Sequence, residues 1–207
     1  VSFPLDGLWA EADIDYVGLD WYAPMADWGD GADHADADWG DGRSRVYLDS
    51  NIEGGEAFDW YYADAEGRAA QERLPISDGA HGEPWVFRQK DIRGWWGHTH
   101  HPRVDGVRSG TPTAWTPGMK PVRFVETGCP GVDKGANQPN VFFDPKSAES
   151  ALPHRSDGSR DDLIQRRALE AMHAHWTGEA MIPPDGIAVW AWDARSFPAF
   201  PLREDVW

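Results

Sequence analysis

The sequence predicts an α/β fold in which parallel strands are joined by helical crossovers. Short apolar segments, typical of strands buried on both faces, lie at residues 14–19, 84–88, 121–125 and 187–192. Long segments separate them, and parallel strands need long crossovers where antiparallel hairpins need only short turns. The last crossover carries a strong helical pattern at residues 160–176. Strands alternating with helices in this way indicate an α/β architecture.

The connecting segments differ in character. An Asp- and Gly-rich loop is expected at residues 26–43, and a helix within residues 51–74, where residues 65–73 contain good helix formers. Residues 91–117 are expected to form an irregular loop. Ser159 is expected to cap the helix at 160–176, with Asp162 as its capping-box partner. Helical spacing is expected to place four residues on one face of this helix: Ile164, Ala168, Met172 and His175.

Four strand–helix units make half of an eightfold barrel. A half barrel leaves two sheet edges unpaired and its interior uncovered, so it needs partner strands to be stable. The chain starts at Val1 rather than Met and stops at Trp207, just after a strand-like segment. We therefore expect residues 1–207 to be a single partial domain within a longer polypeptide.

Composition excludes several classes of function. The formal net charge of −16 disfavours binding to nucleic-acid phosphates or anionic membrane surfaces. No apolar run approaches the ~20 residues of a membrane helix, so membrane insertion is not expected. A single cysteine, Cys129, excludes an internal disulfide. The 13 tryptophans suit a groove where indole rings stack on sugar rings, or a large aromatic core.

Charged and aromatic residues gather where the expected strands end. In α/β barrels the catalytic and substrate-binding side chains lie at the carboxyl ends of the strands. Glu126 directly follows the apolar strand at 121–125 and is the best candidate for a catalytic carboxylate. Such a nucleophile should stay ionised beside an Arg or Lys. The alternative is a Glu that only pairs with an Arg at a strand end. The other strand-end positions are Asp20-Trp21-Tyr22, residues 88–91 and residues 190–195.

Neither a metal nor a cofactor is expected. Six Asp residues crowd the loop at 26–43, but their spacing departs from a calcium-binding loop, so a solvated acidic loop is the preferred interpretation. His98, His100 and His101 lie in one segment and lack separate converging ligands. They are expected to form a polar loop over the groove. Cys129 is interpreted as a buried thiol rather than a nucleophile.

Six stretches carry a resemblance to a known family: DWYY at 59–62, PWVFR at 84–88, ETGCP at 126–130, DKGANQPN at 133–140, DDLIQRR at 161–167 and WAWDAR at 190–195. Together they resemble the TIM-barrel-like glycoside hydrolase domain of tail baseplate proteins of gene transfer agents and related siphophages of alphaproteobacteria. The resemblance runs from about residue 14 to residue 207. It implies that the chain is the carboxyl-terminal half of a TIM-like barrel, strands five to eight.

The resemblance also implies roles for individual residues. Glu126 matches the nucleophile at the end of strand seven, whereas the general acid at the end of strand four would precede Val1. The fragment alone is therefore expected to be inactive. Either Trp190 or Trp192 would form the floor of a sugar subsite. From the sequence itself, Trp95 and Trp96 are expected to stack on sugar rings and extend the cleft. The full set of expected substrate-binding residues is Asp20, Tyr22, Arg88, Asp91, Trp95, Trp96, Trp190, Trp192 and Asp193.

Two functions remain open from the sequence. The first is an enzyme that cleaves a bacterial envelope glycan during attachment or penetration. The second is a non-catalytic carbohydrate- or receptor-binding or structural domain of the tail baseplate. Both imply a protein made in the bacterial cytoplasm, carried in a phage or gene transfer agent particle, and contacting other baseplate proteins.

Overall fold

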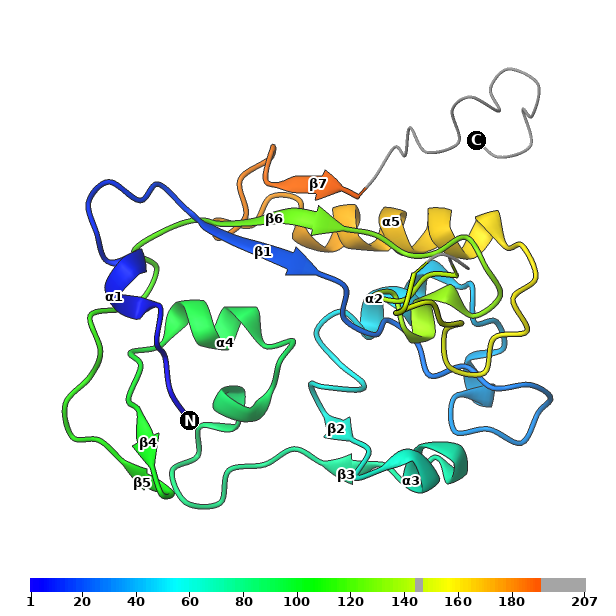
Figure 1. The fold of residues 1–207 in the computed structure, drawn as a ribbon, viewed down its shortest axis with the longest axis horizontal. Coiled ribbons are helices and arrows are strands. Elements are labelled where there is room, and N and C mark those ends of the chain that lie inside the picture. The colour runs from blue at the N-terminus through cyan, green and yellow to red at the C-terminus, as the bar shows by residue number, and fades with distance from the viewer. Residues whose placement is uncertain (144–146, 191–207) are drawn as a thin grey trace.

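A computed structural model describes residues 1–143 and 147–190 of the chain (Figure 1). Its elements, in chain order, are α1 (Asp6–Trp9), β1 (Val17–Trp21), η1 (Ala37–Trp39), α2 (Arg45–Ser50), β2 (Trp60–Tyr61), α3 (Ala65–Ala70), β3 (Leu74–Pro75), η2 (Pro84–Phe87), α4 (Ile92–Gly97), β4 (Arg103–Val104), β5 (Val107–Arg108), β6 (Val122–Thr127), η3 (Gly135–Asn137), α5 (Asp162–Trp176) and β7 (Ile187–Val189). The η elements are 3₁₀ helices.

The main sheet is parallel, with strand order β1-β6-β7. Helices occur in both crossovers, as the sequence predicts, and α5 lies alongside β6 and β7 (Figure 1). Val17 lies opposite Val122, and Leu19 lies opposite Phe124. A bulge then brings Asp20 opposite Glu126. The parallel α/β architecture is therefore confirmed for this sheet.

The predicted strand at 84–88 is wrong. Residues Pro84–Phe87 form the 3₁₀ helix η2, so β1 pairs directly with β6. Pro84 occupies the first turn, where its fixed φ and missing N–H fit a helix better than a ladder. Trp85 is buried and stacks on His98, while Phe87 stays exposed. The described residues thus supply three strands to the parallel sheet rather than four.

The crossover between β1 and β6 is more structured than predicted. The helix expected within 51–74 is confined to α3, and α2 ends at Ser50. The loop expected at 91–117 contains α4 and the antiparallel ribbon of β4 and β5. These short elements were missed because their stability comes from packing rather than from a long sequence period.

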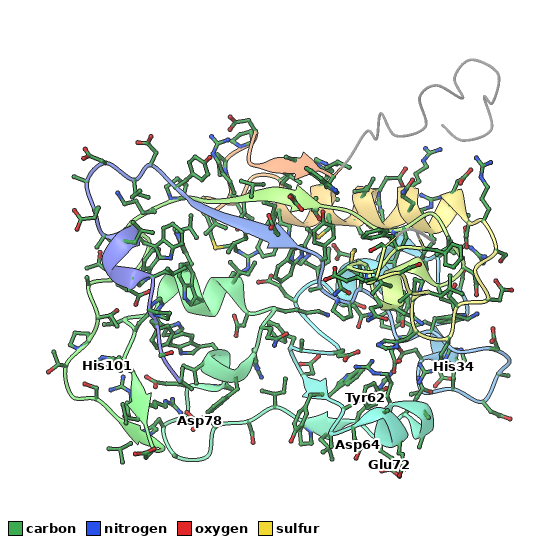
Figure 2. The ribbon with its side chains drawn as sticks, in the orientation of Figure 1. His34, Tyr62, Asp64, Glu72, Asp78 and His101 are labelled. Atoms are coloured by element: carbon green, nitrogen blue, oxygen red, sulfur yellow. The ribbon has the colours of Figure 1, made fainter. Side chains whose placement is uncertain are left out.

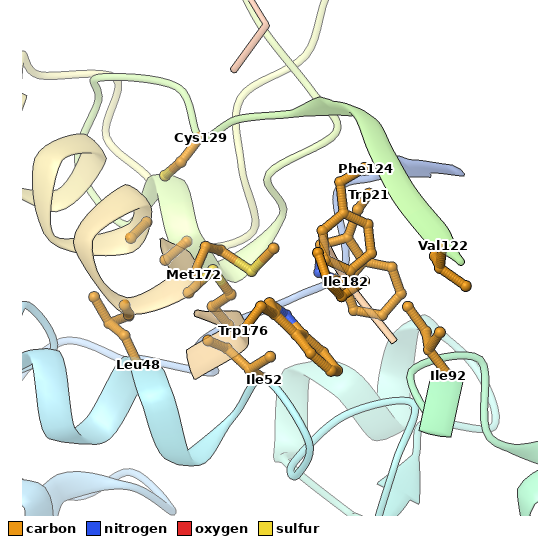
Figure 3. Packing of buried hydrophobic residues seen from close by; sticks show 14 of the residues in the cluster. Trp21, Leu48, Ile52, Ile92, Val122, Phe124, Cys129, Met172, Trp176 and Ile182 are labelled. Carbon is orange, nitrogen blue, oxygen red and sulfur yellow. The ribbon is translucent and has the colours of Figure 1, made fainter. Parts of the chain in front are cut away.

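One face of the sheet packs on α2 and α5 and forms the core (Figure 3). Trp21 stacks on Phe124 with ring centroids 5.6 Å apart, and Phe124 meets Trp176 edge to face at the same distance. Leu48 and Ile52 approach this cluster from the α2 side. Ile164, Ala168 and Met172 are buried, which confirms the predicted face of α5.

The other face of the sheet carries exposed apolar groups. The side chains of Tyr16 and Val125 meet above Gly18, where a Cβ atom would lie 3.3 Å from Val125. Tyr16 is 42% exposed and Val125 is 40% exposed. Parallel sheets are normally covered by other elements on both faces, whereas these apolar side chains on the second face are partly exposed to solvent.

The cap of α5 is Asp161 rather than the predicted Ser159. The Asp161 carboxylate accepts a hydrogen bond from the Ile164 N–H at 3.1 Å and pairs with Arg43 at 2.6 Å. We expect Asp161→Ala to lower the free energy of unfolding by about 1–2 kcal/mol. Ser159→Ala is the matched control and should change it by less than about 0.5 kcal/mol. Equal losses in urea unfolding of the two variants would contradict this assignment.

The acidic loop is not simply solvated, which corrects the prediction for residues 26–43. Asp27 and Asp36 are buried, and Arg73 bridges them with contacts of 2.8 Å to each. Tyr47 donates a hydrogen bond to Asp36 at 2.6 Å, and its Oη accepts one from the Asp27 N–H. These carboxylates tie the loop to the rest of the domain.

His175 links α5 to the α2 region. Its ring nitrogens lie 3.1 Å from Asp49 and 2.9 Å from Glu53. Burial lowers the pKa of His175, but the hydrogen bonds to these two carboxylates outweigh it, so the pKa is raised overall. Charged His175 therefore stabilises the fold fully below its unfolded pKa of about 6.5, and this contribution is lost as pH rises through the higher folded pKa.

We accordingly expect His175→Gln to destabilise the protein more at about pH 6 than at about pH 9. Urea unfolding of wild type and variant at the two pH values measures the difference. His173→Gln, at an exposed position of the same helix, is the control and should change the free energy of unfolding by less than about 0.5 kcal/mol at either pH. A loss that is the same at both pH values would contradict the charged role of His175.

Candidate functional site

The carboxyl ends of β1 and β6 bring two carboxylates together. Asp20 and Glu126 are register partners on neighbouring parallel strands, directly after a bulge in the pairing, so their backbones lie side by side. Asp20 is exposed and Glu126 is half-buried. The structure thus places the predicted catalytic carboxylate beside a predicted substrate-binding one.

Tyr22 orients Glu126. The Tyr22 hydroxyl donates a hydrogen bond to Glu126 Oε2 at 3.0 Å. Burial, this bond and the nearby charges of Glu126 and Asp20 raise the pKa of Tyr22, so the phenol stays protonated and remains a donor. Among the described residues, no Arg or Lys lies within ion-pair distance of Glu126, contrary to the expected cationic neighbour. Within this part of the chain, Glu126 is therefore not the strand-end ion pair considered as the alternative.

Gly128 allows the strand ends to close around Glu126. A Cβ atom at Gly128 would lie 2.7 Å from the Trp190 carbonyl oxygen and 3.4 Å from the Tyr22 ring. The Trp190 N–H donates to the Thr127 carbonyl at 2.8 Å, so the chain pairs with β6 beyond β7. The Trp190 side chain is 62% exposed at this end of the sheet. A larger residue than Gly at 128 would push these segments apart.

A hollow of about 430 Å³ opens at these strand ends. Asp20, Trp21 and Tyr22 line it from β1 and its extension, and Glu56 and Arg68 line it from the first crossover. Its remaining polar lining consists of Gln89, Asn137, Gln138, Asn140 and His154. Glu126 is not part of this lining but contacts it through Tyr22. Carboxylates beside amides and a tryptophan can bind the hydroxyl groups of a ligand.

A second hollow, of about 690 Å³, runs along the free side of β1. It brings together Asp20, Arg88, Asp91 and Trp95, four of the predicted site residues. Asp91 also caps α4 through a 2.7 Å hydrogen bond from the Gly94 N–H, and Arg88 lies 3.6 Å from Asp91. Trp96 packs against the core instead, with its Nε1–H donating to the Lys120 carbonyl at 2.8 Å.

A comparison with known protein families agrees with this parallel α/β architecture. A family model described as the GTA TIM-barrel-like domain matches residues 1–201. The chain belongs to this gene transfer agent family. No curated protein matches the sequence. The family explains the parallel sheet and associates the domain with a gene transfer agent particle.

The three clustered histidines of this TIM-barrel-like domain serve its structure. His100 is fully buried between Asp6, at 2.8 Å, and the Trp95 carbonyl, at 2.6 Å. His98 and His101 each contact a backbone carbonyl, of Gly94 and Ser109. The predicted polar loop over the groove is therefore wrong for His100. Over residues 1–143 and 147–190, no group of three or more His, Cys, Asp or Glu side chains is arranged to hold a metal ion.

Other predictions for this GTA domain have mixed outcomes. Cys129 is buried, as predicted, and burial together with nearby Asp161 raises the pKa of its thiol to about 12. Trp192 and Asp193 lie outside the described residues. No helix in the described part of the chain is long and apolar enough to cross a membrane. Sequence reasoning missed Glu56, Gln89 and His154, which sit in loops or short elements without a repeating pattern.

Proposed function

We propose that β1, β6 and β7 are strands six to eight of a (β/α)8 barrel that needs further strands to close. The exposed Tyr16 and Val125 support this arrangement, because they lie on the sheet face that a closed barrel would cover. In this arrangement β6 is the seventh strand, and the carboxylate of Glu126 points toward the barrel mouth. The described residues supply three strands to this barrel rather than the four of a half barrel, because residues 84–88 do not form a strand.

We further propose that the domain is a glycoside hydrolase-like module acting on a bacterial envelope glycan. The main support is the hydrogen bond from the protonated Tyr22 hydroxyl to Glu126. Tyr22 and the nearby Asp20 both line the polar hollow at these strand ends. Glu126 would attack the anomeric carbon while the bond to the leaving sugar oxygen breaks. The proton for that oxygen would come from an acid on a strand outside residues 1–207. Asp20 would bind hydroxyl groups of the sugar.

The second candidate is a non-catalytic module that binds a carbohydrate or receptor. One observation favours it: in the described part of the chain no Arg or Lys lies within ion-pair distance of Glu126, where a glycosidase nucleophile is expected to have one. In both candidates the domain would sit in the tail baseplate of the particle, contact other baseplate proteins, and be assembled in the bacterial cytoplasm.

Glycan cleavage by the intact protein separates the two candidates. Purified host peptidoglycan and surface polysaccharide are incubated with the protein, and released reducing ends are measured. Release from one of these glycans supports the enzyme. Binding of a glycan by both wild type and Glu126→Gln, with no reducing ends from either, supports the binding module instead.

A further inference from the structure

The hollow beside Asp20 continues into a neighbouring one. The neighbour, of about 510 Å³, is lined by Tyr62, Asp64, α3 and Arg155. The two hollows share Arg68 and His154, so these residues stand at the junction. Tyr62 and Asp64 lie beside α3 (Figure 2), and of these two hollows they line only the second. The two hollows therefore adjoin at Arg68 and His154.

We propose that His154 binds a sugar hydroxyl at this junction, and that the glycan there is an uncharged unit of a chain spanning both hollows. This inference rests on the proposed function and deepens it, because it names a contact residue and a class of sugar that the strand-end carboxylates alone do not define.

The backbone holds His154 in place. The buried Asn137 amide donates to the His154 carbonyl at 2.9 Å, and it also binds both the N–H and the carbonyl of Trp28. The next residue, Arg155, has a φ of 64°, which is rare for a residue other than glycine. Its guanidinium donates to Asp27 at 2.5 Å and to the Arg68 carbonyl at 2.6 Å. These contacts maintain an unfavourable backbone conformation, as is common at binding sites.

The imidazole of His154 remains available to a ligand. It is half-buried, and none of the hydrogen bonds found among the described residues uses its ring nitrogens. Burial and the charges of Arg68 and Arg155 lower its pKa more than Glu56 and Asp27 raise it. At neutral pH the ring is therefore uncharged, with one donor and one acceptor, which suits a sugar hydroxyl.

The charges around the junction are already compensated. Arg68 pairs with Glu56, and Arg155 pairs with the buried Asp27. An anionic sugar would meet Asp20 without finding an unpaired cation among the residues that line the first hollow. This balance favours an uncharged unit with hydroxyl or amide groups over a uronic acid or a phosphorylated sugar.

The test uses the intact protein and oligosaccharides made by partial hydrolysis of host envelope glycans. Anion exchange separates them into uncharged and anionic fractions, and calorimetry at pH 7 measures binding. Wild type should bind the uncharged fraction and not the anionic one. His154→Ala should weaken that binding at least about fivefold, and His154→Gln should weaken it less, because the amide keeps one donor and one acceptor.

Control variants distinguish a failure of the His154 proposal from a failure of the proposed glycan function. His173→Ala, at an exposed position on α5, should bind as wild type does, and the melting temperature should show that all variants are folded. If wild type binds no fraction, the proposed glycan function fails. If wild type binds but His154→Ala binds equally well, or if the anionic fraction binds as tightly as the uncharged one, only the present inference is overturned.

Discussion

A Glu126→Gln substitution in the intact protein is expected to lower the rate of glycosidic-bond cleavage at least about 1,000-fold. The amide keeps the shape of the side chain and can still accept the Tyr22 hydrogen bond, but it cannot act as a nucleophile. Glycan affinity should therefore change by less than about threefold. The measurement is reducing-end release from purified host glycan, together with binding to the same glycan.

Glu149→Gln provides the matched control, because Glu149 is an exposed glutamate outside the hollows described above. Its cleavage rate should equal that of wild type. A Glu126→Gln protein that cleaves as fast as wild type would remove Glu126 from the chemistry.

Asp27→Ala is expected to lower the free energy of unfolding by about 3–5 kcal/mol, because it removes a buried carboxylate that pairs with the partly buried Arg73 and Arg155. The Asp27 side chain is only 5% exposed and receives hydrogen bonds from Tyr62, Gln71, Arg73 and Arg155. Although burial opposes the charged form, the bonds from Tyr62, Arg73 and Arg155 lower its pKa overall. The stabilisation is therefore present above the unfolded pKa of Asp, about 3.9, and is lost as pH falls through the lower folded pKa.

Asp30→Ala tests whether burial explains the effect of Asp27. Asp30 pairs with Lys134 at 2.8 Å, but its side chain is 84% exposed, so its loss should cost less than about 1 kcal/mol. Urea unfolding near pH 7 measures both variants. Similar losses for Asp27→Ala and Asp30→Ala would contradict the structural role assigned to the buried network.

The elements predicted well are those whose sequence pattern is local and long. The helix at 160–176 has a regular apolar face, and the strand at 121–125 is a continuous apolar run before Glu126. Residues 84–88 have strand-like composition, yet Pro84 starts a helical turn, and Trp85 is buried and stacks on His98. Propensity failed there because tertiary contacts decided the conformation.

The candidate site was only partly predictable for the same reason. The carboxylates could be found because parallel strands align their ends, which placed Asp20 and Glu126 at one edge. The Tyr22 hydrogen bond joins residues 104 positions apart, and Arg155 reaches Asp27 across 128 positions. No local pattern encodes such contacts. His154 was missed because it lies in a loop whose shape depends on Asn137 and Asp27.

The most direct test of the central claim is a structure of the intact Glu126→Gln protein with an oligosaccharide from the host envelope glycan bound. We predict an anomeric carbon within about 3.5 Å of the side chain at position 126, with neighbouring sugars in the hollow lined by Asp20 and Tyr22. An oligosaccharide bound elsewhere, with no sugar atom in contact with residue 126, would contradict the claim that Glu126 is the centre of the site.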